Sequence, residues 1–262
     1  MSVLVEHKWG FFSCCSVKLH EIVKYINSHN NLPEHVDSSR SFGFYKLRNQ
    51  DDITYDYYEH YDNIPNICYV TNVDYYEHYQ YNDYSTLHYE QITPIVKKYF
   101  TPSSEINNII ANIERKYNID HDNICVLFYR GNDKNTETQI CGYSEYVDYA
   151  KNIIAQNPQI KFLLQSDETE FLEFMLKLFP DNSFYFKDEI RHMTKRTDTV
   201  DRAMRDNIDV FSKNYLAITI IMSKCKHIIC GSGNCSIWIM LYRGNNSNVC
   251  QNLQGKWLEN VS

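Results

Sequence analysis

The pattern of apolar and polar positions is clearest in the carboxyl-terminal half of the chain. Residues 124–129 form an unbroken apolar run, which is typical of a strand buried on both faces. Three further apolar runs predict strands at residues 160–164, 183–186 and 227–230. Helical spacing predicts helices at residues 143–155, 168–179, 210–224 and 234–242, the last followed by Gly244. Strands that alternate with helices in this way predict an α/β domain built on a doubly wound parallel sheet.

The amino-terminal half begins with a similar but weaker pattern. Residues 3–5 predict a short strand, and residues 10–15 a turn of small and aromatic residues. Residues 16–28 then predict a helix, and residues 34–37 are a candidate second strand. This β-α-β opening is of the kind that begins a nucleotide- or sugar-binding domain.

The segment at residues 49–90 has little periodicity and holds many of the 22 tyrosines. Within it, residues 67–70 are a candidate strand, and two Tyr-Glu-His pieces indicate either a repeat or, as we favour, biased composition. Residues 94–100 and 103–117 predict helices. We expect a domain boundary near residues 101–102, which separates an α/β domain (1–101) from a second α/β domain (102–262).

Charge and cysteine content narrow the class of protein. A net charge of −7 argues against a general binder of nucleic acid or membrane surfaces, because both need a basic field. The nine cysteines are odd in number and form no C-x-x-C pair, which favours buried free thiols in a reducing, cytoplasmic compartment over disulfides or a zinc site. No apolar stretch reaches the ~20 residues of a membrane span, and the first residues have no signal-peptide pattern.

Charged and small residues follow three of the predicted strands where each strand ends. Because the carboxyl ends of parallel strands lie at one edge of a sheet, where such sheets bind ligands, we expect these residues to form one site. The candidates are Arg130, Gly131, Asn132, Asp133, Lys134 and Glu137 after the first strand, Ser166, Asp167 and Glu168 after the second, and Gly231, Ser232, Gly233, Asn234 and Ser236 after the last.

Each of these groups has a ligand-binding interpretation and a purely structural one. Arg130 can bind a phosphate bidentately and Lys134 adds a point charge, although charged residues also follow strands as solvated loops. Ser166 or Asp167 is a good helix N-cap, although a carboxylate here also suits a base or a ribose. The turn at residues 231–236 can hold an anion on its backbone N–H groups, or can simply lead into a helix. Together the three groups favour a nucleotide-diphosphate site.

The first group resembles a motif of the fucosyltransferase superfamily with GT-B architecture, which includes α-1,6-, α-1,2- and protein O-fucosyltransferases. In that family a strand is followed by His-x-Arg-Arg-x-Asp-Lys. Here Arg130, Asp133 and Lys134 match the motif, while Phe128 and Gly131 replace the histidine and the second arginine.

The other two groups extend the resemblance over roughly residues 121–245. Residues 162–168 resemble the family's second motif, an apolar strand that ends in a small hydroxyl residue and acidic residues. Residues 222–236 resemble its third motif, a helix, a short turn, a strand and a small-residue turn into a helix. The high content of asparagine and tyrosine resembles that of proteins from low-GC genomes, such as those of giant DNA viruses.

The resemblance implies two Rossmann-like domains, an acceptor-side α/β domain (1–101) and a nucleotide-sugar donor-binding domain (102–262). It also implies an inverting transfer that needs neither a metal nor another cofactor. The donor would be a nucleotide-diphosphate sugar, GDP-fucose above all, and the acceptor a glycan or glycoprotein. By resemblance, Arg130 neutralises the β-phosphate, with Lys134 and Asn132 beside it. Asp167 or Glu168 contacts guanine or ribose, and the turn at residues 232–236 holds phosphate or sugar.

Inversion also requires a base that removes the proton of the acceptor hydroxyl. Glu137 is our first candidate for this role and Asp133 the second. Because Gly131 replaces an arginine, a catalytically silent relative that binds nucleotide sugar or glycan is an alternative hypothesis. A third is an unrelated α/β enzyme that acts on a phosphorylated small molecule. The tyrosines of residues 55–89 form either one wall of the acceptor cleft, since aromatic faces suit sugar rings, or core and loop packing.

Overall fold

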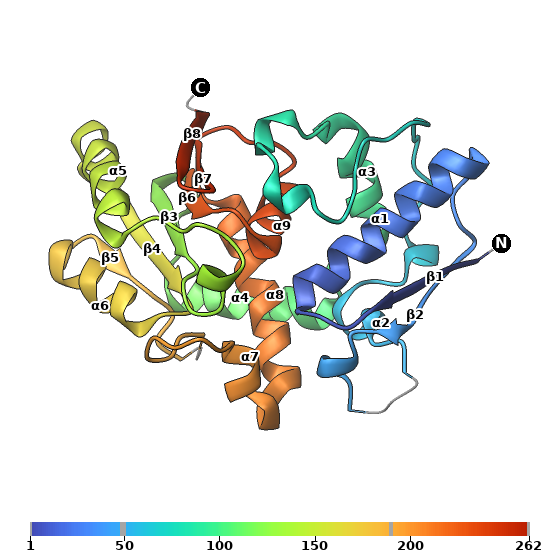
Figure 1. Cartoon of the computed structure of the whole chain (residues 1–262), viewed down its shortest axis with the longest axis horizontal. Coiled ribbons are helices and arrows are strands. Elements are labelled where there is room, and N and C mark those ends of the chain that lie inside the picture. The colour runs from blue at the N-terminus through green and yellow to red at the C-terminus, as the bar shows by residue number, and fades with distance from the viewer. Residues whose placement is uncertain (1, 48–50, 189–190, 261–262) are drawn as a thin grey trace.

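The computed structural model describes residues 2–47, 51–188 and 191–260 of the 262-residue chain. Two sheets organise it: a two-stranded parallel sheet near the amino terminus and a six-stranded sheet in the carboxyl-terminal half. In Figure 1 the larger sheet lies to the left, the small sheet to the right, and helices α8 (Ile208–Lys224) and α9 (Asn234–Arg243) between them.

The remaining elements follow in chain order. The first part of the chain contains β1 (Ser2–His7), α1 (Phe11–His29), β2 (His35–Ser41), α2 (Thr54–Tyr57), α3 (Tyr89–Tyr99) and α4 (Ser104–Lys116). The second part contains β3 (Ile124–Tyr129), α5 (Tyr143–Gln156), β4 (Lys161–Ser166), α6 (Thr169–Leu178), β5 (Ser183–Phe184), α7 (Val200–Ala203), β6 (His227–Gly231), β7 (Val249–Leu253) and β8 (Lys256–Asn260).

The strand order of the large sheet defines where a ligand can bind. The order is β5-β4-β3-β6-β7-β8, and all neighbours are parallel except β7 and β8. The chain therefore runs outward from β3 in one direction through β4 and β5, and in the other through β6 and β7. Doubly wound sheets bind ligands beyond the carboxyl ends of the strands at such a reversal point, which here lies between β3 and β6.

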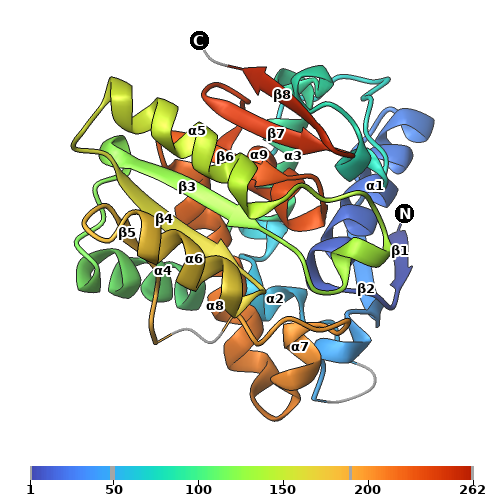
Figure 2. The same cartoon turned by 60° about the vertical axis from the view of Figure 1, so that its left-hand side comes forward.

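Strand β3 is buried along its whole length because helices cover both faces of the sheet. Cys125, Leu127 and Tyr129 pack with α5 and α6, whereas Val126 and Phe128 belong to the core formed with α4, α8 and α9. Figure 2 shows these two helical layers on opposite faces. The continuous apolar run in the sequence is a direct consequence of this double burial.

The amino-terminal helix α1 packs against α9 and links the two halves of the chain. Ser16 donates a hydrogen bond to Asn234 Oδ1 at 2.9 Å and accepts one from Trp238 Nε1 at 3.0 Å. The larger apolar core extends without interruption from α1 to α9. As a result, the start of α1 is held beside the carboxyl edge of the large sheet.

Two sequence predictions about local structure are wrong. Residues 10–15 are not a turn, because α1 already begins at Phe11, whose backbone N–H donates to the Tyr45 hydroxyl at 2.8 Å. Residues 67–70 form no strand; Ile67 and Tyr69 pack on the core, whereas Cys68 and Val70 are exposed. The sequence analysis also missed β7 and β8, and the predicted strand at residues 183–186 is only two residues long.

The buried free thiols predicted from the sequence are present in the structure, with one exception. All nine cysteines are free, and all except Cys68 are buried.

Among the helices that the structure describes, none has both the length and the apolar character needed to cross a membrane.

Candidate functional site

A cavity of about 660 Å³ opens at the carboxyl edge of the large sheet, within the size range of small-molecule sites. The ends of β3, β4 and β6 form one side of it, and the first turn of α1 and the segment around α7 form the other. Most residues predicted from the strand ends line this cavity: Arg130, Asp133, Lys134, Glu137, Ser166, Asp167, Ser232, Gly233, Asn234 and Ser236. The expected convergence of three strand ends is therefore present.

The four other predicted residues, Gly131, Asn132, Glu168 and Gly231, lie outside the cavity. Asn132 is buried and connects two loops, since its Nδ2 donates to Asp167 O at 2.6 Å and its Oδ1 accepts from Arg196 N at 2.9 Å. Glu168 is fully buried and bonded to the Tyr143 hydroxyl, with Lys195 Nζ at 3.5 Å. Gly231 is the last residue of β6, and its carbonyl oxygen accepts a hydrogen bond from the Ser236 hydroxyl in the first turn of α9.

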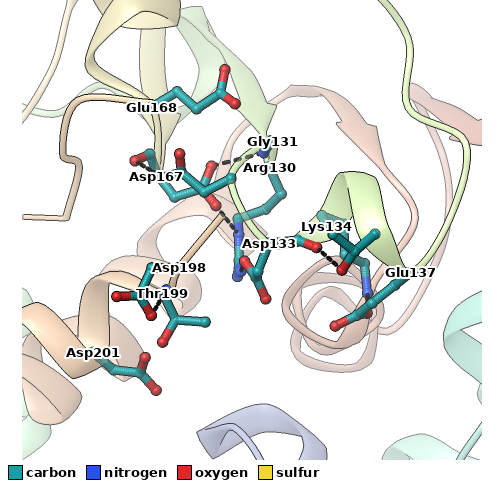
Figure 3. A network of polar contacts seen from close by, with 12 residues as sticks. Arg130, Gly131, Asp133, Lys134, Glu137, Asp167, Glu168, Asp198, Thr199 and Asp201 are labelled. Carbon is teal, nitrogen blue, oxygen red and sulfur yellow. Dashed lines mark hydrogen bonds and ion pairs between the residues drawn. The ribbon is translucent and has the colours of Figure 1, made fainter. Parts of the chain in front are cut away.

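Arg130 lies at the centre of the polar network in Figure 3. Its Nε donates to Asp167 Oδ2 at 2.9 Å, its Nη2 to Asp133 Oδ1 at 2.9 Å, and its Nη1 to the Tyr215 hydroxyl at 3.4 Å. Burial acts to lower the pKa of Arg130, but Asp167, Tyr215 and Asp133 outweigh it and raise that pKa well above its ordinary value. The guanidinium is thus permanently charged, and each of its nitrogens already has a partner.

Lys134 and Glu137 form a second ion pair at the rim. Lys134 Nζ lies 2.6 Å from Glu137 Oε2, and 5.5 Å from the centre of the Tyr81 ring. The lysine side chain is 10% exposed and the glutamate 45% exposed, so the carboxylate faces solvent while the ammonium is held inside. The residue predicted as a base is therefore paired with the residue predicted as a phosphate-binding cation.

Gly131 has no room for a side chain. A Cβ atom there would lie 2.1 Å from Glu168 Oε1 and 2.6 Å from the Tyr129 ring, far inside van der Waals contact. The buried Glu168 carboxylate thus occupies the space that a second arginine in the strand-end motif would need. This contact gives a physical reason for the departure from the motif.

Two helix N-termini line the cavity, where the sequence predicted one. Gly233 and Asn234 begin α9, as predicted, and Phe11 begins α1. Neither helix has an acidic residue in its first turn. The positive ends of both helix dipoles therefore act on the cavity together, as in anion sites.

The sequence analysis missed several residues that line the cavity. Arg191 lies against Tyr215, with 4.0 Å from its guanidinium carbon to the ring centre. Asp198, Thr199 and Asp201 enter from the segment before α8, as Figure 3 shows; Asp201 accepts a hydrogen bond from the Tyr45 hydroxyl at 2.7 Å. One signal was available: a long aperiodic segment joins β5 to α8, and such segments at a sheet's ligand-binding edge often carry function.

The described residues contain no cluster of histidine, cysteine, aspartate or glutamate side chains arranged to hold a metal ion. The cations and helix ends of the cavity are the groups placed to attract a negative ligand.

Comparisons by sequence find no relative: no protein-family model matches the chain, and no curated protein matches it. Comparison of structures defines the class of fold, which is the mixed α/β, fucosyltransferase-like GT-B fold. Structures of NodZ are among those that match this fold. NodZ alpha-1,6-fucosyltransferase co-crystallised with GDP gives a TM-score of 0.58 at 11% identity, covering 99% of this chain and 98% of that chain.

Two further NodZ structures agree. The enzyme soaked with GDP-fucose gives a TM-score of 0.56 at 11% identity, with 99% of each chain covered. Fucosyltransferase NodZ from Bradyrhizobium gives 0.57 at 10% identity, with 99% of this chain and 98% of that chain covered. The predicted α/β fold with a parallel-dominated sheet, of the GT-B kind, is therefore confirmed, and the division into two Rossmann-like domains stays a prediction.

Proposed function

We propose that the chain is an inverting, metal-independent glycosyltransferase that transfers a sugar from a nucleotide-diphosphate donor, GDP-fucose first, to a glycan or glycoprotein. One observation carries this proposal. The cavity lies at the carboxyl edge of the sheet in a fold shared over 99% of the chain with NodZ, an alpha-1,6-fucosyltransferase with structures containing GDP and soaked with GDP-fucose.

The two sides of the cavity suit the two substrates. In our proposal residues 102–262 hold the nucleotide donor, and residues 1–101 face the acceptor. Trp9 supports the second assignment, because its side chain is 71% exposed at the cavity and offers an aromatic face to a sugar ring. Arg130, Asp133, Lys134, Glu137 and Asp167 line the cavity from the segments that follow β3 and β4.

The chemistry asked of the site is stabilisation of a leaving diphosphate. Arg130, Lys134 and the N-terminus of α9 line one wall and supply positive charge and N–H donors. A phosphate that takes Lys134 away from Glu137 also releases the Glu137 carboxylate. That carboxylate then accepts the proton of the acceptor hydroxyl, whose oxygen attacks the anomeric carbon as the diphosphate leaves from the opposite side. Asp133, paired with Arg130, is the second candidate base.

The polar residues of the second and third strand ends complete the donor side. We assign Ser232, Gly233 and Ser236 to phosphate or sugar, and Ser166 and Asp167 to the base or ribose. Glu168 receives no such role, because Tyr143 and Lys195 enclose its carboxylate outside the cavity. Asn132 supports the loop rather than the ligand.

A second candidate function is a catalytically silent module that binds a nucleotide sugar. The observation that favours it is the pairing of both motif cations, Arg130 with Asp133 and Asp167, and Lys134 with Glu137. A site of this kind binds a donor only if the ligand competes successfully with these carboxylates.

Release of nucleotide from a panel of GDP- and UDP-sugars, with and without glycan acceptors, separates the two candidates. An enzyme releases GDP from GDP-fucose, and this release is lost in Glu137→Gln or Asp133→Asn but retained in Glu90→Gln, which changes an exposed glutamate outside the cavity. Nucleotide binding with no release in any combination identifies the silent module. If no nucleotide binds, both candidates are wrong.

A further inference from the structure

Arg191 is a cation of the cavity that no carboxylate of the described residues neutralises. It lies in the segment between β5 and α7, with its guanidinium carbon 4.0 Å from the centre of the Tyr215 ring. Its Nη1 atom is buried and has no hydrogen-bond partner. Buried guanidinium groups are normally paired, because an unpaired charge loses its hydration without compensation.

The other cations that line the cavity differ in this respect. Arg130 has two carboxylates at 2.9 Å, Lys134 has Glu137 at 2.6 Å, and Arg202 has Asp198 at 3.5 Å. Lys8 is exposed to solvent. Among the described cations of the cavity, Arg191 is therefore the half-buried one that has a buried nitrogen atom, Nη1, without a hydrogen-bond partner.

Arg191 and Arg130 converge on the same side chain. Arg130 Nη1 donates to the Tyr215 hydroxyl, and Arg191 stacks on the face of the same ring. Burial, together with the nearby charge of Arg130, holds the pKa of Arg191 below its ordinary value, and Tyr215 and Cys235 offset only part of this effect. A ligand with two negative charges beside Tyr215 would relieve the repulsion and satisfy the open N–H groups at once.

The strand end cannot provide this second cation. A side chain at Gly131 would collide with the Glu168 carboxylate, so residue 131 has no means of contacting a ligand. The segment before α7 brings an arginine to the same cavity from a different direction.

We propose that Arg191 binds the diphosphate of the nucleotide donor and acts, with Arg130, as the second arginine of the site beside Tyr215. This inference rests on the proposed nucleotide-sugar function and adds a residue to it. It predicts a preference for nucleoside diphosphates over monophosphates that depends on Arg191.

Calorimetric titration of the full chain with GDP and with GMP tests the proposal. The variant is Arg191→Gln. The matched control is Arg196→Gln, which removes the same charge from an exposed side chain of the same segment outside the cavity. We expect Arg191→Gln to weaken GDP binding by about 10- to 100-fold and GMP binding much less, since a charge-assisted contact to the second phosphate is lost. Arg196→Gln should bind both ligands like the unmodified chain.

Thermal unfolding without ligand gives a second measurement. If Arg191 only stabilised the fold, Arg191→Gln would lower the melting temperature. If Arg191 is retained for a ligand, removal of its unpaired charge leaves the melting temperature unchanged or raises it, and Arg191→Lys keeps part of the GDP preference. Should the unmodified chain bind GDP and Arg191→Gln bind it equally well, the inference about Arg191 is wrong and the proposed function stands. Should the unmodified chain bind no nucleotide, both are wrong.

Discussion

The Arg130 guanidinium and the Asp167 carboxylate join the ends of neighbouring strands β3 and β4 through an ion pair of 2.9 Å. The Asp167 side chain is only 6% exposed, and its other oxygen accepts a hydrogen bond from Gly131 N at 2.8 Å. The Asp167 carboxylate therefore holds both the Arg130 side chain and the Gly131 backbone in the motif that follows β3. This arrangement makes Asp167 a structural determinant of the cavity as well as one of its lining residues.

We expect Asp167→Asn to reduce the free energy of unfolding by about 1–3 kcal/mol, because the amide leaves a partly buried guanidinium without its main partner. Urea denaturation at pH 7 measures the loss. Asp188→Asn is the control: it removes a carboxylate from an exposed ion pair with Lys116, where solvent screens the interaction. An equal effect of the two substitutions would contradict the role given to Asp167.

Gly131→Ala should destabilise the fold by about 1–3 kcal/mol, because the new methyl group overlaps the buried Glu168 carboxylate. Glu168→Ala in the same chain removes the overlapping atoms, so the double variant should lose less than the sum of the two single variants. Gly43→Ala, where no atom lies within 4 Å of the added methyl group, should have little effect. Strictly additive losses in the double variant would show that Glu168 is not the obstacle.

Alkaline pH should destabilise the chain through its buried thiols. Burial raises the pKa of Cys14 to about 11 and that of Cys230 to about 12, from 9.0. These folded-state pKa values lie above the unfolded value. The thiols' contribution to the free energy of unfolding is therefore complete below pH 9 and is lost as the pH rises towards 11–12. Each such thiol contributes a slope of about 1.4 kcal/mol per pH unit. Lys18 has the opposite effect on the free energy of unfolding. Burial lowers its pKa to about 8, so its contribution rises with pH above about 8, but it is a single group.

The free energy of unfolding, measured in urea at several values between pH 7 and pH 10, should therefore fall above pH 9. Cys230→Ser should make this fall less steep, whereas Cys68→Ser, at an exposed position, should leave the slope unchanged. Identical slopes for the two variants would argue against a protonated, buried thiol at residue 230.

Much of the carboxyl-terminal fold could be predicted because its signals are local. A strand buried on both faces, such as β3, must be apolar throughout, and a helix C-terminus such as that of α9 favours glycine at the left-handed position, here Gly244. Strands β7 and β8 were missed because they are short and contain polar residues such as Gln251 and Asn252, which are buried only through contacts with distant parts of the chain.

The site was predictable to the extent that strand ends define it. Arg130, Asp133 and Asp167 follow strands whose register aligns them, whereas Arg191 comes from an aperiodic segment whose path depends on tertiary packing. The division at residues 101–102, the cytoplasmic compartment and the viral origin stay predictions, since no structural feature bears on them.

Calorimetric titration of the unmodified chain with GDP, with UDP as comparison, is the most direct test that this cavity binds a nucleotide-sugar donor. We expect saturable binding of GDP, stronger than that of UDP, and weakened by about tenfold or more in Arg130→Ala. Absence of binding for both nucleotides, by a chain shown to be folded, would contradict it.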